Sequence, residues 1–355
     1  MQEDTFPAAE RILADIENVF KRDPKLKEFD IIPVTVNHNK SPLHHVEHCL
    51  ALESWCVRHV YCYAYHRLLD TRHFRHRRAD PEVTSRLLLG ALLLNPDVST
   101  FWNMRKELVQ SGRLDVQSEL HFSVVILSRK PKSAEAFSYR RYLLEKLLTT
   151  GADKIHLLEE ELQVCAVAAD RYPGNYHAWQ HRTWSMVRLA DTDQLWLKEW
   201  QWSEGWMSLH ISDYSGLHYR QFLLRHLLGD GNAGIAACTE IITSELESST
   251  DLITRYPSHE ALWNYRRSVL TCAKEYLPKF DSYSNAAVLT ASVNGKCVPE
   301  NGFECGTVFK PEEFWKRIVQ QERHFVDRCK MTDKQFVLRH LHWMLKALGV
   351  NLEEG

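Results

Sequence analysis

Apolar residues recur at the spacing of an amphipathic helix along most of the chain, in runs separated by short polar breaks. Five of these runs precede a common turn phrase, at 84–94, 116–128, 157–170, 195–207 and 236–247. After each phrase a second helical run follows, beginning "RKELVQ", "RRYLLEKLL", "RTWSMVRLA", "RQFLLRHLL" and "RRSVL". The pattern therefore predicts five successive helix pairs.

The turn phrase is most complete in "YPGNYHAWQHRTW" (172–184), where a proline is followed by a tryptophan and then by an arginine. A large apolar residue stands three positions before the arginine in every copy: Trp102 and Arg105, Phe137 and Arg140, Trp179 and Arg182, Leu217 and Arg220, Trp263 and Arg266. Four copies carry the proline, whose fixed φ suits a helix start. Self-similarity of this kind is typical of stacked repeats.

The repeat predicts an all-α fold, because one helix pair cannot bury its apolar face alone and stacked neighbours make the core continuous. We expect five helical-hairpin repeats over 84–277, after an N-terminal extension with capping helices over 1–83. The extension contains an extended stretch at 29–45 and a helix at 54–74. Gly, Ser, Asn and Pro predict an irregular loop over 278–311, and a closing helix pair is expected over 312–355.

The composition excludes several classes of protein. The 355 residues are 44% hydrophobic and 25% charged, as in a folded protein. A net charge of −2 gives no basic field for nucleic acid. No apolar run is long enough to span a membrane, and the acidic, amphipathic start of the sequence is unlike a signal peptide. Nine unpatterned cysteines predict reduced thiols and a cytoplasmic protein.

The phrase resembles the repeat of protein prenyltransferase alpha subunits. "NYHAWQHR" (175–182) is similar to the third repeat of that family and "LWNYRR" (262–267) to the fifth, and the resemblance covers residues 84–275. It implies a right-handed superhelical crescent of stacked hairpins wrapped around a separate beta subunit. It also implies that this chain binds no cofactor, because zinc and geranylgeranyl diphosphate are held by the beta subunit.

The resemblance further implies an alpha subunit of a heterodimeric protein geranylgeranyltransferase of the third type, inactive without its partner. That partner would be the beta subunit of Rab geranylgeranyltransferase. The reaction would transfer geranylgeranyl from its diphosphate to C-terminal cysteine thiols of proteins, among them a SNARE that already carries a farnesyl group.

Four residues carry over from the family's active site. Lys132 stands where a family lysine reaches the leaving diphosphate, and a cation there would stabilise developing negative charge. Glu135 replaces a glutamine that meets the C-terminal carboxylate of CaaX substrates, and its charge should repel that group. Tyr176 and His177 match residues at the mouth of the active site.

Each candidate also has a plainer interpretation. The tryptophans and arginines of the phrase, with His181, are expected to be structural, and some to contact the beta subunit: Trp102, Arg105, Arg140, Trp179, His181, Arg182, Arg220, Trp263 and Arg266. Without the resemblance, Lys132 is an ordinary solvated lysine. His177 and His181 are four apart on a helix, but no further ligand joins them to make a zinc site.

One further cluster is a weaker candidate for a metal site. His44, His45, His48 and Cys49 lie close together in sequence, yet a fourth ligand and a second shell cannot be named, so no metal site is expected.

Two other functions compete with that of a transferase subunit. One is a helical scaffold without catalytic activity, favoured by Phe137 and by the loss of the Asn-Tyr pair in several repeats. The other is a nucleic-acid-binding array, which the near-neutral charge opposes.

Overall fold

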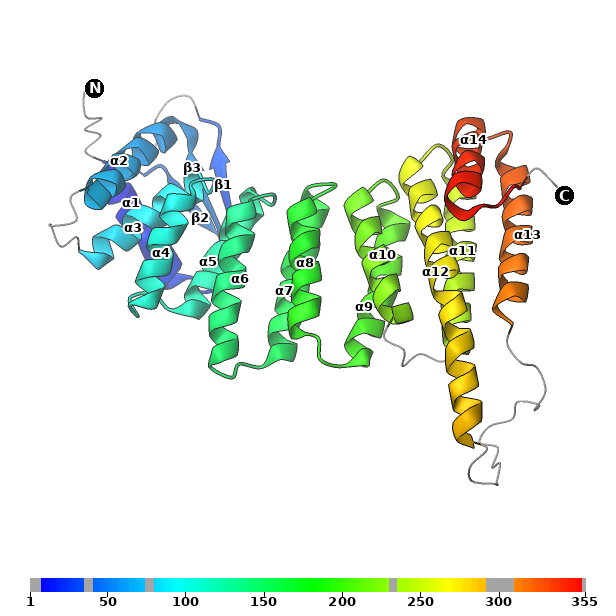
Figure 1. The fold of residues 1–355 in the computed structure, drawn as a ribbon. Coiled ribbons are helices and arrows are strands. Elements are labelled where there is room, and N and C mark those ends of the chain that lie inside the picture. Colours follow the sequence, from blue (N-terminus) through cyan, green and yellow to red (C-terminus); the bar gives the residue numbers. More distant parts are fainter. Residues whose placement is uncertain (1–7, 35–40, 74–79, 230–234, 292–309, 353–355) are drawn as a thin grey trace. The chain divides into compact units, whose positions relative to one another are not determined.

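A computed structural model describes the chain over 8–34, 41–73, 80–229, 235–291 and 310–352, with the side chains of 72–73 and 277–291 excepted (Figure 1). The chain forms two compact units, Met1–Ala190 and Asp191–Gly355. The predicted block of five repeats is thus divided between the units. The all-α prediction is confirmed by the helices that make up most of both units, while the predicted crescent and its handedness stay predictions.

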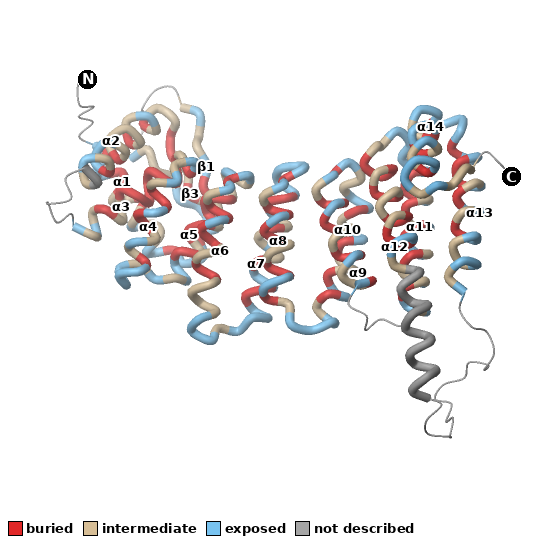
Figure 2. The backbone as a smooth tube through the Cα atoms, viewed as in Figure 1, coloured by how far each residue is buried: buried red, intermediate tan, exposed pale blue. Residues whose placement is uncertain are grey.

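The first unit stacks three helical hairpins on an N-terminal subdomain. Its helices are α1 (Ala9–Arg22), α2 (Ser54–His73), α3 (Pro81–Leu94), α4 (Ser99–Gln110), α5 (Val116–Arg129), α6 (Ala134–Thr149), α7 (Lys154–Arg171) and α8 (Tyr176–Leu189). First helices contact first helices (α3 with α5, α5 with α7), and second helices contact second helices (α4 with α6, α6 with α8). The hairpins therefore form two layers, with buried residues lining the sides where helices meet (Figure 2).

The second unit continues the same pattern. It contains α9 (Asp193–Leu209), α10 (Tyr214–Gly229), α11 (Ile235–Arg255), α12 (Glu260–Ala291), α13 (Pro311–Cys329), α14 (Lys334–Trp343) and a short π-helix, Met344–Leu348. Helices α10, α12 and α14 form one layer, and one core of buried apolar residues runs from Met207 to Met344. The closing helix pair expected after residue 312 is present as α13 and α14.

The extension contains a small sheet that the sequence pattern did not predict. Strand β1 (Glu28–Ile32) pairs in parallel with β3 (Cys49–Glu53), and β2 (Leu43–Val46) pairs antiparallel with β3. The stretch 29–45 was expected only to be extended, and β3 lies beyond it. The pairing of β1 with β3 joins segments about twenty residues apart, so local periodicity carries no signal for it. Strand β1 packs on α5.

The clustered histidines hold this sheet to its neighbours. His45 Nε2 lies 2.8 Å from Asp23 Oδ2, and His48 Nδ1 lies 2.8 Å from Asp23 Oδ1, at the end of α1. His44 instead contacts Glu53, with 3.0 Å between Nε2 and Oε1. The histidines are thus divided between two buried carboxylates, and their visible role is to anchor the β2–β3 hairpin.

The proline of the phrase does not begin a helix, which corrects the expected position. Helix α8 starts at Tyr176, three residues after Pro173, and Asn175 caps it by accepting a hydrogen bond from Ala178 N at 3.2 Å. Between them, Gly174 has a left-handed backbone with φ of 66°, and Ser258 has φ of 69° at the matching place before α12. The proline therefore sets the turn, and a capping side chain sets the helix start.

The loop expected over 278–311 is also partly corrected. Helix α12 continues to Ala291, through "AAVLTA", a run without glycine or proline that suits a helix. Residues 292–309 lie outside the described residues, together with Cys297 and Cys305. None of the seven cysteines in the described part of the chain forms a disulfide.

Candidate functional site

A buried carboxylate joins neighbouring helix pairs within each unit. Arg140 of α6 donates from Nε to Glu161 Oε2 of α7 at 2.9 Å, and a second guanidinium nitrogen also bonds that carboxylate. The same arrangement links Arg105 to Glu119, Arg220 to Glu245 and Arg266 to Glu322. Each arginine named here is at most 2% exposed. A charge-assisted bidentate pair of this kind is strong and fixes geometry.

Three of these arginines, and Arg182, also bind the first helix of their own repeat. Nη1 donates to a main-chain carbonyl 20 residues earlier, from Arg140 to Leu120, Arg182 to Leu162, Arg220 to Trp200 and Arg266 to Leu246, at 2.6–2.8 Å. In three repeats Nη1 also donates to a serine, namely Ser123, Ser203 or Ser249. One guanidinium thus joins three helices.

Four glutamates receive a further bond from the second helix of their own repeat. The donor is Tyr139 to Glu119, His181 to Glu161, Tyr219 to Glu199 and Tyr265 to Glu245. In the closing pair, His340 Nε2 lies 2.8 Å from Glu322 Oε1. Burial alone would raise the pKa of Glu161, but Arg140 and His181 outweigh it and lower the pKa to about 2. The contacts of these buried glutamates join helices to one another, as expected of residues with a structural role.

The glutamates were missed from sequence, although a signal exists. Each stands 21 residues before the arginine of its own repeat: 119 and 140, 161 and 182, 199 and 220, 245 and 266.

The tryptophans of the phrase are buried as well, and Trp102 Nε1 donates to the Pro96 carbonyl at 2.8 Å. That some of these residues contact a beta subunit stays a prediction.

The residues carried over from the family's active site lie on a different, accessible part of the first unit. We call Lys132, Arg141, Tyr172, Tyr176 and His177 the α6/α8 surface. Lys132 Nζ lies 4.7 Å from the centroid of the Tyr172 ring, and the Tyr176 and His177 rings are 5.5 Å apart, edge to face. Tyr176 is 57% exposed. This surface joins two cations to three aromatic rings.

The charges of this surface act on His177. Burial lowers the pKa of its imidazole, and Lys132 and Arg141 lower it further because a second positive charge is unfavourable beside them. The lowered pKa therefore favours the neutral form of His177 at pH 7. Glu135, half-buried in the first turn of α6, makes no hydrogen bond or ion pair with any described residue.

The described part of the chain holds no candidate metal centre. Its histidines, cysteines and carboxylates form no group of three that could hold a metal ion. His181 is committed to Glu161, and the histidines at 44, 45 and 48 are divided between Glu53 and Asp23. Within the same residues no helix has the length and apolarity to cross a bilayer.

A known family profile matches the repeats of this chain. The profile of the protein prenyltransferase alpha subunit repeat matches residues 116–147, 158–189, 196–227 and 242–273. Each match covers one hairpin, from α5–α6 to α11–α12. The pair α3–α4 lies outside the matches, yet its Arg105 makes the same contact with the next glutamate.

Whole proteins match as well. The chain is 35% identical over 311 residues to protein prenyltransferase alpha subunit repeat-containing protein 1 of Homo sapiens, covering 73% of this chain and 76% of the relative. The Danio rerio protein of that name is 35% identical, covering 76% and 73%. The alpha subunit of geranylgeranyl transferase type-2 of Rattus norvegicus is 27% identical, covering 55% and 34%. The chain belongs to the protein prenyltransferase alpha subunit family.

Proposed function

We propose that this chain is the alpha subunit of a heterodimeric protein geranylgeranyltransferase of the third type, with the beta subunit of Rab geranylgeranyltransferase as its partner. The observation that carries the proposal is the α6/α8 surface, where Lys132, Tyr176 and His177 come together on two neighbouring repeats. Its support is the relation to prenyltransferase alpha subunits, one of which is named for geranylgeranyl transfer.

In the proposed reaction the bond between the isoprenoid carbon and the diphosphate oxygen breaks as a carbon–sulfur bond forms with the substrate thiolate. Diphosphate leaves with both electrons of the broken bond. Lys132 would stabilise the charge that grows on that oxygen, and electrostatic stabilisation of this kind is usually the largest single contribution to catalysis. Neutral His177 adds no third positive charge beside Lys132 and Arg141 and would donate a hydrogen bond.

Zinc and the isoprenoid are proposed to be held by the beta subunit. The described residues of this chain do not fit a zinc site, since they bring no three suitable ligands together. The contribution of this chain is therefore to close one wall of the site and to place charge there. The proposed acceptors are proteins with C-terminal cysteines, including a farnesylated SNARE.

Glu135 supports an acceptor other than a free CaaX tail. Its side chain is half-buried and has no cationic partner among the described residues, so its charge is not neutralised within the chain. A carboxylate brought close to it would be repelled. We propose that this repulsion directs the enzyme to acceptors presented by the beta subunit in another way.

The test is co-expression with the Rab-type beta subunit, followed by size exclusion and by transfer of labelled geranylgeranyl to a cysteine-ended acceptor. Lys132→Ala should leave the complex intact and slow transfer by about 10²-fold, as for other lost contacts to developing charge. Lys154→Ala, which removes an exposed lysine at the start of α7, is the matched control.

Equal rates for Lys132→Ala and the wild-type protein would remove Lys132 from the mechanism. A complex without any transfer, or no complex, would favour the scaffold that Phe137 suggested. Transfer by the isolated chain would contradict the proposal that it is inactive alone.

A further inference from the structure

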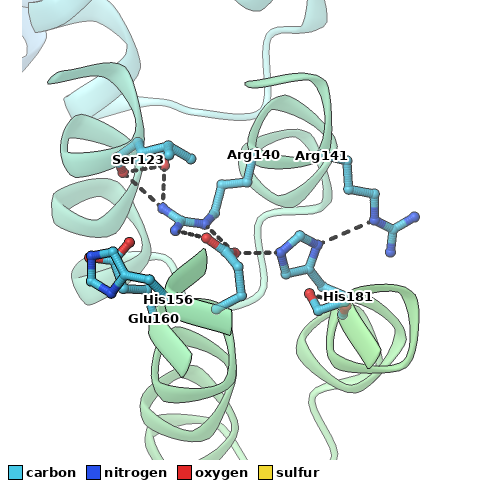
Figure 3. Close-up of polar contacts among 9 residues, drawn as sticks. Ser123, Arg140, Arg141, His156, Glu160 and His181 are labelled. Carbon is cyan, nitrogen blue, oxygen red and sulfur yellow. Dashed lines mark hydrogen bonds and ion pairs between the residues drawn. The ribbon is translucent and has the colours of Figure 1, made fainter. Parts of the chain in front are cut away.

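Arg140 and Arg141 are adjacent in sequence but have different surroundings. Arg140 points into the repeat junction, where Glu161 neutralises it, whereas Arg141 leaves α6 toward α8 (Figure 3). Arg141 Nε donates to His181 Nδ1 at 3.3 Å, and its guanidinium carbon lies 5.7 Å from the centroid of the Trp184 ring. The Nε nitrogen of Arg141 is thus bound to His181, and the two Nη nitrogens make no hydrogen bond to a described residue.

A buried chain of hydrogen bonds fixes this arrangement. Glu161 accepts from His181 Nε2 at 2.7 Å, so Nε2 carries the proton. Burial lowers the pKa of His181, which keeps the ring neutral and leaves Nδ1 as an acceptor. Nδ1 therefore faces Arg141 Nε with its lone pair, and the ring itself is packed against Phe137 and Trp184.

Arg141 differs from the buried and half-buried arginines nearest to it in kind. Arg86, Arg105 and Arg140 each pair with a glutamate, and half-buried Arg129 donates from Nη1 to the Leu94 carbonyl. No described carboxylate pairs with Arg141, and its Nη nitrogens make no hydrogen bond to any described residue. A half-buried guanidinium without an anion is unfavourable, so an anionic ligand would gain affinity by supplying the missing partner.

The second unit offers a comparison. Arg266 and Arg267 repeat the sequence pair, and Glu322 and His340 repeat the buried carboxylate and its histidine. There, however, Arg267 Nη1 donates to Asn264 Oδ1 of its own helix at 2.9 Å, and His340 Nδ1 receives no hydrogen bond from a described residue. The outward-held guanidinium therefore belongs to the α6/α8 surface and is not a general consequence of the repeat.

We propose that Arg141 binds an oxyanion of the substrate through its two Nη nitrogens and that His181 positions it for this role. The inference rests on the proposed function and adds a second anion-binding residue beside Lys132. Two nitrogens in one plane match two oxygens of one group. The oxyanion is either the diphosphate of the isoprenoid or the C-terminal carboxylate of the acceptor.

The first experiment uses the complex with the beta subunit and distinguishes these sources. Affinity for inorganic diphosphate is measured by titration calorimetry, and KM is measured for an acceptor peptide ending in a carboxylate and for its amide. Arg141→Gln should either lower the affinity for diphosphate or raise the KM for the carboxylate peptide. The expected change is about 10- to 100-fold, the range for losing a hydrogen bond to a charged group. Arg188→Gln, an exposed arginine of α8 that pairs with Glu145, is the matched control.

A loss in the diphosphate arm assigns Arg141 to the isoprenoid. A loss for the carboxylate peptide, with the amide unchanged, assigns it to the acceptor. Arg141→Lys keeps the charge but loses the two-nitrogen geometry and the bond to His181, so it should restore only part of the affinity. No difference between Arg141→Gln and Arg188→Gln in either arm overturns the proposal.

The role of His181 has its own readout. His181→Gln should weaken the same arm as Arg141→Gln, and the double variant should be no weaker than Arg141→Gln alone. Lowered thermal stability with unchanged affinity would show a structural role only.

A final titration needs no beta subunit, so it separates this proposal from the proposed function. Inorganic diphosphate and an acetylated peptide ending in a carboxylate are added to the isolated chain, and the Nε–H resonance of Arg141 is followed by NMR. A saturable shift with either ligand supports the proposal even if no complex forms. Absence of a shift in the isolated chain, with no loss in the complex, overturns it.

Discussion

Replacing Glu161 by glutamine should destabilise the first unit by about 3–5 kcal/mol. The side chain is 1% exposed and bonds Arg140 twice and His181 once. The substitution keeps its shape but leaves the guanidinium of Arg140 as a buried charge without an anion, and breaking a buried pair in this way costs about 3–5 kcal/mol. The pKa of Glu161 gives a similar size: it falls from 4.5 to about 2 on folding, equivalent to about 3 kcal/mol.

The sign of the pH dependence follows from that lowered pKa. The stabilisation by ionised Glu161 is complete above its unfolded pKa of 4.5 and is lost as the pH falls from 4.5 through about 2. The difference between Glu161→Gln and the wild-type protein should therefore be largest at pH 7 and shrink at acid pH. Loss of the difference on raising the pH would contradict the argument.

Urea denaturation measures this effect. Circular dichroism and tryptophan fluorescence at pH 7 follow both units, since Trp55, Trp102, Trp179 and Trp184 lie in the first unit and the other seven tryptophans lie in the second. Glu145→Gln is the control, because Glu145 is 44% exposed, pairs with Arg188 and should change the free energy of unfolding by less than about 1 kcal/mol. If Glu161→Gln and Glu145→Gln unfold at the same urea concentration, the buried carboxylate does not hold the repeats together.

Three further predictions follow from individual residues. Trp263→Ala should destabilise the second unit by about 3–5 kcal/mol in the same assay, because the indole is fully buried against Phe325. Gly174→Ala should cost about 1–2 kcal/mol through its left-handed backbone alone, since nothing lies within 4 Å of an added Cβ. Glu135→Gln should raise transfer to free CaaX tails relative to other acceptors in a competition assay, and an unchanged preference would show that its charge does not select the substrate.

The repeat was predictable from sequence because its signal is local and occurs five times. Trp179 and Arg182 lie on one turn of a helix, and their spacing returns at Trp102 and Arg105 and at Trp263 and Arg266. The glutamate that each arginine binds lies in another helix at a distance set by loop length. A phrase read around the arginine therefore did not include it. The constant spacing of 21 residues joins each glutamate to the arginine of its own repeat, whereas the arginine that binds it belongs to the preceding repeat.

Other features depend on contacts that no short stretch contains. Strand β3 forms because Cys49–Glu53 finds β1 and β2 on its two sides, and residues 49–53 alone do not show this. The exposure of Lys132 beside Tyr172 depends on how α6 packs on α8. The candidate site residues were named by resemblance, and their role stays a prediction, whereas the placement of Arg141 depends on its contact with His181 in another helix.

The adjacent arginines of α6 differ in how their charge is compensated. Arg140 has a carboxylate, a carbonyl and a serine as partners, so its charge is fully compensated inside the fold. Arg141 shares the helix and even the same network, through His181, but no described carboxylate neutralises it. Because His181 is bound to Glu161, the network that locks two repeats together also fixes the direction of Arg141. A substrate that binds Arg141 would thus meet a group held in place by the structural core, and little ordering would remain to oppose its binding.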